Sequence, residues 1–171
     1  MRNRVPAFTL IELLVVIGIL GLLIGILMPS FQRMRQLALR VPCVKNLQNA
    51  SIAMRMYLDN NDDIMPLAAQ LPSAHLNDFP RIADLLAPYL SAPEALRCPA
   101  DRETNYFARD GSSYEYMAIL GGRKVSSSFL TRLWGEDRTP VMYDYEPFHG
   151  PPGEVGSSNY LFADGHVGAL Q

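Results

Sequence analysis

Cysteine and surplus positive charge are both scarce in this chain of 171 residues. The sequence has 15 lysines and arginines against 17 aspartates and glutamates, which gives a formal net charge of −2. Because a phosphate backbone is bound through an excess of basic side chains, a nucleic acid is not an expected partner. The two cysteines, Cys43 and Cys98, are too few for a disulfide framework and belong to no CxxC or HxxxH pattern. The sequence therefore predicts no metal site and at most one disulfide.

Charge is also nearly absent from residues 8–28, where Glu12 is the one charged side chain. As an α-helix this segment would be about 31 Å long, which matches the hydrocarbon thickness of a bilayer. A cleaved signal peptide is one alternative, but the apolar run exceeds a usual h-region and no small-x-small cleavage site follows it. An ordinary single-span anchor is another alternative, and there the Glu12 carboxylate costs a few kcal/mol unless a partner satisfies it.

The beginning of the chain resembles type IV prepilins and type II secretion pseudopilins. A short leader with Arg2 and Arg4 precedes the letters FTLIE at 8–12, and an unbroken apolar run follows. The resemblance implies that a prepilin peptidase cuts between Ala7 and Phe8 on the cytoplasmic face of the membrane and methylates the new amino terminus. The family usually has glycine before the cut, and this chain has Ala7 there.

The same resemblance implies a partner for Glu12, namely the freed amino terminus of a neighbouring subunit. A buried carboxylate is tolerated when a positive group meets it, and removing one member of such a pair is costly. The implied function is structural: a subunit that is stored in the bacterial inner membrane and assembled into a pilus or a secretion pseudopilus. Its implied partners are the prepilin peptidase, related pilin subunits and the assembly machinery, with the leader cytoplasmic and the C-terminal domain extracytoplasmic.

Beyond the apolar run, the helical pattern continues in amphipathic form. Apolar residues recur at helical spacing through 31–58, and the pattern stops at the turn-forming cluster 59–63. We therefore expect one helix over about 8–58, loosened at Pro29 and again at Pro42. The expected organisation is a leader at 1–7, a transmembrane and assembly helix at 8–28, its amphipathic continuation at 29–58 and an extracytoplasmic pilin-like domain at 59–171.

The remainder of the chain is expected to form a small antiparallel sheet. The expected elements are a short helix at 82–90 and strands at 113–120, 140–145, 159–163 and 166–170. The last two strands flank Asp164 and Gly165, a pair typical of two-residue type I′ turns. The expected fold class is α+β and pilin-like, with the long N-terminal helix packed on the sheet.

The later sequence resembles pilin-like proteins that carry a processing-associated His…Asp-Gly motif near the C-terminus. The segments that carry this resemblance are 43–48, 97–101, 113–116 and 162–167. The spacing from His149 to Asp164 is wider than in the family pattern. Residues 150–158 are therefore interpreted as an insertion.

Catalysis and calcium binding find little support in the sequence. The histidines His75, His149 and His166 belong to no Ser/His/Asp or Cys/His order, so no catalytic residue is assigned. Some pseudopilins hold calcium in their C-terminal loops, and four carboxylates could collect around such an ion: Asp101, Asp144, Glu146 and Asp164. No EF-hand spacing supports that site, and a turn role is favoured for Asp164.

Two questions stay open, and each has two alternative answers. In the oxidising space outside the inner membrane, Cys43 and Cys98 would form a bridge between the helix and the loop region, or they would remain two buried thiols. The chain would be a filament subunit, or a permanently anchored extracytoplasmic binding domain in which the letters FTLIE are coincidental. Cleavage between Ala7 and Phe8 distinguishes these two functions.

Overall fold

The long helix predicted from the sequence is present. The computed structural model describes residues 9–74 and 78–170, which form two compact units within 1–35 and 36–171. Helix α1 (Leu10–Asp59) belongs to both units and contains Pro29 and Pro42 without a break. Its end lies one residue beyond the predicted end, and the predicted start at residue 8 lies outside the described residues.

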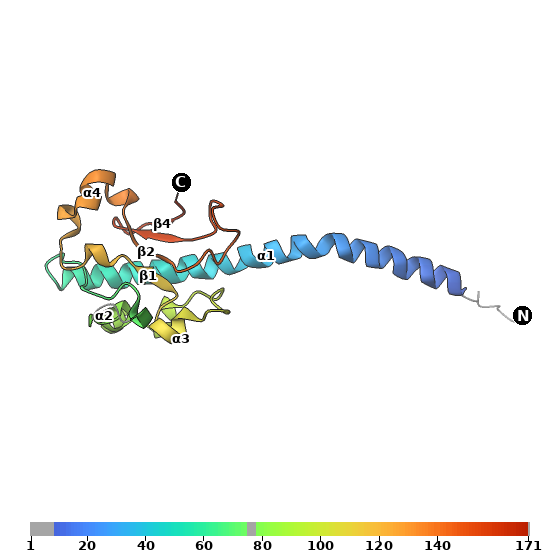
Figure 1. Ribbon diagram of the computed structural model, residues 1–171, viewed down its shortest axis with the longest axis horizontal. Coiled ribbons are helices and arrows are strands. Elements are labelled where there is room, and N and C mark those ends of the chain that lie inside the picture. Colours follow the sequence, from blue (N-terminus) through green and yellow to red (C-terminus); the bar gives the residue numbers. More distant parts are fainter. Residues whose placement is uncertain (1–8, 75–77, 171) are drawn as a thin grey trace, which may run out of the picture. The chain divides into compact units, whose positions relative to one another are not determined.

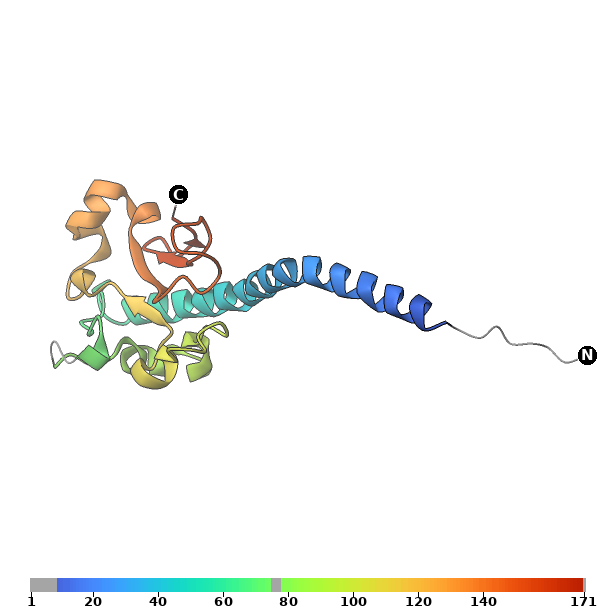
Figure 2. The ribbon, with the colours of Figure 1, turned by 45° about the vertical axis from the view of Figure 1, so that its right-hand side comes forward.

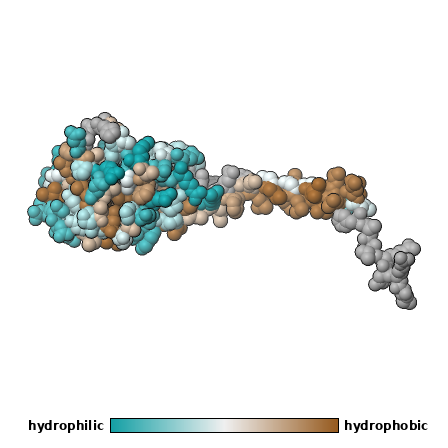
Figure 3. Space-filling model, turned by 90° about the horizontal axis from the view of Figure 1, so that it is seen from below, coloured by the Kyte–Doolittle hydropathy of each residue, from teal (hydrophilic) through white to brown (hydrophobic). Residues whose placement is uncertain are grey.

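In the first unit, α1 exposes an apolar surface. The stretch Leu10–Met28 is long and apolar enough to cross a membrane, by length and composition. Every residue in it is exposed in the isolated chain. Figure 3 shows the corresponding brown surface along this part of the helix. A soluble protein rarely leaves so large an apolar patch uncovered, so this surface requires lipid or another protein.

In the second unit, α1 packs on a four-stranded antiparallel sheet (Figure 1). The strands pair in chain order: β1 (Tyr114–Tyr116), β2 (Pro140–Asp144), β3 (Tyr160–Phe162) and β4 (Val167–Gly168). Residues three or four apart on α1 form one buried stripe: Cys43, Leu47, Ala50, Met54 and Leu58. This stripe shares a core with side chains of β1, β2 and β3. The structure confirms the α+β, pilin-like fold class.

Short helices surround this core. α2 (Ile82–Leu86) and α3 (Tyr106–Asp110) lie on one side of the second half of α1, and α4 (Phe129–Trp134) lies on the other (Figures 1 and 2). The 3-10 helices are η1 (Pro72–Ala74), η2 (Ala87–Tyr89), η3 (Pro93–Leu96), η4 (Ala118–Leu120), η5 (Val125–Ser127) and η6 (Glu136–Arg138). The helix predicted at 82–90 ends early as an α-helix, because Pro88 has no N–H to continue the ladder.

The first strand is shorter than predicted. β1 ends at Tyr116, and the N–H of Met117 makes one further bond to the carbonyl of Val141 (2.9 Å). The partner strand β2 begins at Pro140, so in this register it offers β1 only one further position to pair with. The predicted strand 113–120 therefore gives way to η4 after three paired residues.

The β3–β4 hairpin is confirmed, but its turn is not of type I′. Leu161 pairs with Val167, and the N–H of Phe162 donates to the carbonyl of His166 (2.9 Å), which leaves a three-residue loop at 163–165. Type I′ needs positive φ at both central residues, whereas only Gly165 has it here (φ 92°). Asp164 instead accepts a bond from the N–H of His166 (3.0 Å), as aspartate does in Asx-turns.

We predict that Gly165→Ala destabilises the protein by about 1–2 kcal/mol, because a side chain is disfavoured at positive φ. The new Cβ would also lie 3.2 Å from Oγ of Ser51, which donates to the Gly165 carbonyl. Gly153→Ala is the matched control, since Gly153 has φ 87° and nothing within 4 Å of its Cβ position. Thermal unfolding of the full chain in detergent measures both. Equal destabilisation by the two variants would contradict a role for the Ser51 contact.

Candidate functional site

The start of α1 is a capping box. Oγ1 of Thr9 accepts a bond from the N–H of Glu12 (3.3 Å), and Oε2 of Glu12 accepts bonds from the N–H (2.9 Å) and the hydroxyl (2.7 Å) of Thr9. The first intrahelical bond runs from the N–H of Leu13 to the carbonyl of Thr9 (3.3 Å). Such a box satisfies backbone donors that the first turn of a helix leaves open. This role of Glu12 was not predicted, although the letters Thr-x-x-Glu at 9–12 are the signature of such a box.

Three glycines interrupt the apolar surface that follows. Gly18, Gly21 and Gly25 are spaced three and four apart, so they lie near one face of α1. A Cβ atom built at each of them meets nothing within 4 Å in the chain. Packing inside the described chain therefore gives no reason for glycine at these positions, whereas close approach of a second helix would.

The predicted processing residues, Ala7 and Phe8, lie outside the described residues, and so does His75. Glu12 lies in the first turn of α1, close in sequence to the predicted cut. The roles predicted for these residues therefore stay predictions.

A second site lies in the core of the second unit. Cys43 of α1 and Cys98 of the loop after η3 are joined as a disulfide, with 4.8 Å between their Cα atoms. Nε2 of His149 lies 3.5 Å from Sγ of Cys98 and 3.5 Å from Oδ2 of Asp144. All four side chains are buried. The pairing of the two cysteines in the native protein stays a prediction.

His149 is buried at the base of the loop 150–158, the predicted insertion. The N–H of His149 donates to the carbonyl of Ser157 (3.0 Å), and the N–H of Asp144 donates to the carbonyl of Asn159 (3.1 Å). These bonds close the loop at its base, so the extra residues project from the sheet while His149 stays in the core.

Polar contacts hold Asp144 in place. Its Oδ2 accepts bonds from the backbone N–H (2.8 Å) and the side-chain amide (3.0 Å) of Asn159. The Nε–H of Arg40 in turn donates to Oδ1 of Asn159 (3.0 Å). Burial raises the pKa of the Asp144 carboxyl to about 7, while the bonds from Asn159 and the nearby Arg40 charge act in the opposite direction.

This arrangement is not that of a Cys-His-Asp hydrolase. In such a triad, one ring nitrogen of the histidine faces the nucleophile and the other faces the carboxylate. Here Nε2 of His149 faces both Cys98 and Asp144. One nitrogen atom therefore contacts both partners. A proton relay from Cys98 through the imidazole ring to Asp144 is excluded in this geometry.

The four carboxylates considered for calcium each contact different partners and do not form one cluster in the described residues. Asp101 accepts bonds from the N–H groups of Tyr106 (3.1 Å) and Phe107 (3.0 Å) at the start of α3, while Glu146 accepts from the Tyr106 hydroxyl (2.6 Å). Asp164 lies beside His166, with 2.6 Å between Oδ1 and Nδ1. Within 9–74 and 78–170, the one compact group of three metal-ligating side chains is Cys43, Cys98 and His149.

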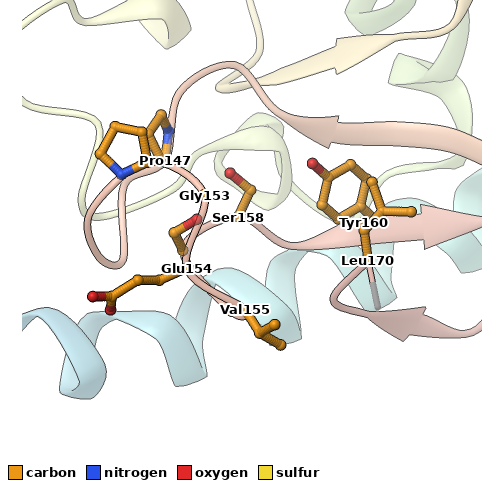
Figure 4. A pocket seen from close by; sticks show the side chains of 10 residues that line it. Pro147, Gly153, Glu154, Val155, Ser158, Tyr160 and Leu170 are labelled. Carbon is orange, nitrogen blue, oxygen red and sulfur yellow. The ribbon is translucent and has the colours of Figure 1, made fainter.

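An open pocket adjoins the inserted loop. Its volume is about 340 Å³, and Figure 4 shows Pro147 and Glu154 on one side of it and Tyr160 and Leu170 on the other. The lining joins the loop 150–158 to β3 and the C-terminal segment. The insertion thus shapes a surface that the core of the sheet alone would not provide.

Comparison with known proteins identifies a motif at the first site, the start of α1. Residues 2–28 match the model of the prokaryotic N-terminal methylation motif. No curated protein and no solved structure matches the chain. The matched segment contains the predicted cleavage point, the capping box and the whole exposed apolar stretch, and the proteins that it marks are structural subunits rather than enzymes. The chain therefore carries, at residues 2–28, the signature of type IV prepilins and pseudopilins.

Proposed function

We propose that this protein is a structural subunit of a type II secretion pseudopilus or a type IV pilus-like filament. It is matured by prepilin peptidase, which cuts between Ala7 and Phe8 and methylates the amino group of Phe8. The observation that carries the proposal is the apolar half of α1, which lies inside the matched motif and is exposed along its described length. The organisation proposed is a leader at 1–7, an assembly helix at 8–28, its amphipathic continuation at 29–58 and an extracytoplasmic domain at 59–171.

The apolar helix suits a subunit in two states, one anchored in the membrane and one assembled in the filament. The N-terminal motif and the helix fit anchoring in the inner membrane, where lipid covers the exposed side chains. Inside a bilayer, helices gain little from apolar contact alone, and small residues allow the close packing that holds them together. The face with Gly18, Gly21 and Gly25 suits such packing. Once subunits leave the lipid, burial of the remaining apolar surface between helices becomes the main driving force.

Glu12 supports assembly through its charge. The capping box satisfies the carboxylate with neutral donors, and such a cap stabilises a helix by about 1 kcal/mol. A charged group inside an apolar bundle costs several kcal/mol more than that, so a positive partner is still needed. Cleavage before Phe8 creates an amine one residue before Thr9, and methylation keeps its charge. The amine of a neighbouring subunit is therefore the proposed partner of Glu12.

The pocket beside 150–158 favours a second candidate function. A concave surface of about 340 Å³ would suit a permanently anchored extracytoplasmic domain that binds a ligand. Such a protein would need the apolar helix only as an anchor. It would need no cut before Phe8 and no new amine.

We predict that the mature protein, recovered from its native host, begins at Phe8 and carries a methyl group on its amino nitrogen. Mass spectrometry of the intact chain and of its N-terminal peptide measures both. An Ala7→Gly variant, which restores the residue usual in prepilins, is the control and should be cleaved at least as completely. A mature chain that retains Met1 or Arg2 would contradict the filament function and support the anchored binding domain.

We predict that Glu12→Gln folds and inserts into the membrane normally but lowers filament yield more than about tenfold. The glutamine keeps an acceptor for the N–H of Thr9 and removes the charge, and breaking a buried ion pair costs about 3–5 kcal/mol. Thr9→Val is the matched control, because it removes the Thr9 hydroxyl from the capping box and keeps the Glu12 charge. Sheared filaments and membrane fractions are quantified by immunoblot. Normal yield from Glu12→Gln, with a loss in Thr9→Val, would assign Glu12 to capping alone.

A further inference from the structure

The fold brings three metal-ligating side chains together from distant parts of the sequence. Sγ of Cys43, Sγ of Cys98 and Nε2 of His149 all lie within 4.8 Å of one another, and all three residues are buried. They come from α1, from the loop after η3 and from the segment after β2. Two sulfurs and one imidazole nitrogen are donors that zinc prefers.

The separation of Cys98 from His149 fits a tetrahedral ion, whereas the two sulfurs are joined as a disulfide and would have to move apart. Zn–S and Zn–N bonds of about 2.3 and 2.1 Å, at the tetrahedral angle, place a sulfur and a nitrogen ligand about 3.6 Å apart. The observed separation of Sγ of Cys98 from Nε2 of His149 is 3.5 Å. Asp144 lies beside this pair, with its Oδ2 3.5 Å from Nε2 of His149.

Asp144 lies outside this group of three and is the candidate for a fourth ligand. Its Oδ2 is held by two bonds from Asn159, as the outer contacts of ligating carboxylates usually are. Its Oδ1 is buried and has no hydrogen-bond partner within the described part of the chain. A buried carboxylate oxygen without a donor is costly, and a bound cation would satisfy it. Arg40, bonded to Asn159, offsets the negative charge of two thiolates and a carboxylate around one divalent ion.

We propose that the thiol form of this protein binds one Zn²⁺ ion through Cys43, Cys98, His149 and Asp144. The newly made chain carries both cysteines as thiols, so binding needs no reductant: two thiols and one Zn²⁺ give a zinc dithiolate and two protons. A rotation about the Cα–Cβ bond of Cys43 would separate the sulfurs and leave Sγ of Cys98 beside His149. The inference does not depend on the proposed filament function.

The zinc form and the disulfide form exclude each other, because the same two sulfurs serve both. Conversion of one to the other requires an oxidant with a disulfide of its own, such as a thiol–disulfide oxidoreductase. The zinc dithiolate, the oxidant's disulfide and two protons then give the Cys43–Cys98 disulfide, two thiols on the oxidant and free Zn²⁺. The two electrons pass from the cysteine sulfurs to the oxidant, and the ion is released unchanged.

The test uses the full chain in detergent, in a reduced and an oxidised sample that are both stripped of metal. Each is given Zn²⁺, dialysed and analysed for metal content, and alkylation with mass spectrometry counts the free thiols. We expect one Zn²⁺ in the reduced chain with two free thiols, and none above background in the oxidised chain. Co²⁺ in place of Zn²⁺ should give the visible bands of a tetrahedral thiolate site.

Variants assign the ligands. His149→Ala and Asp144→Asn should each weaken Co²⁺ binding about tenfold or more and change the visible spectrum, and the double variant Cys43→Ser/Cys98→Ser should abolish the thiolate bands. His166→Ala is the matched control, because His166 is an exposed histidine outside the cluster, and its binding should equal that of the unmodified chain.

Two results would overturn the zinc site. One is a reduced chain that binds no more Co²⁺ than the double cysteine variant, and the other is an unchanged affinity and spectrum in His149→Ala. Circular dichroism covers the case in which reduction unfolds the domain. Zn²⁺ should then restore the folded spectrum of the reduced chain and raise its thermal transition, and failure to do so also counts against the site.

Discussion

An amphipathic or apolar helix is stable in water only where another surface covers its apolar side chains, and α1 has such cover in its own chain over the stripe from Cys43 to Leu58. The stretch Leu10–Met28 exposes every residue. Folding of the second unit therefore leaves a large apolar surface that only lipid or other helices can cover. In the proposed function, lipid in the membrane and neighbouring helices in the filament would cover the same apolar side chains.

The polar start of this apolar helix obeys a related constraint. Four N–H groups at the start of any helix lack intrahelical acceptors, and in lipid no water is present to satisfy them. Thr9 and Glu12 supply acceptors within one turn. The bonds that cap the helix also fix the carboxylate four residues after the proposed new N-terminus at Phe8. In the proposed filament, a side chain that caps its own helix would thus also face a neighbour's amine.

Much of the fold could be predicted because its signals are local. The helical period of α1 and the turn-forming residues at 59–63 set its end, and alternation around Asp164 and Gly165 located the hairpin. The predictions were wrong where pairing with a neighbouring strand decided the length of a strand or the type of a turn. Register with β4 selected a three-residue turn, and β1 is short where its partner strand β2 begins at Pro140. A pattern within one strand carries no information about where its neighbour begins.

The buried cluster could not be predicted because its ligands are 55 and 51 residues apart in sequence. Zinc patterns are recognised by short spacings, and only tertiary packing gives this group its shape. The wider spacing from His149 to Asp164 led only to the interpretation of 150–158 as an insertion, which stays a prediction. The bond from the N–H of His149 to the carbonyl of Ser157 closes the loop at its base. The base of the loop is thus fixed by a backbone contact that no spacing in the sequence indicates.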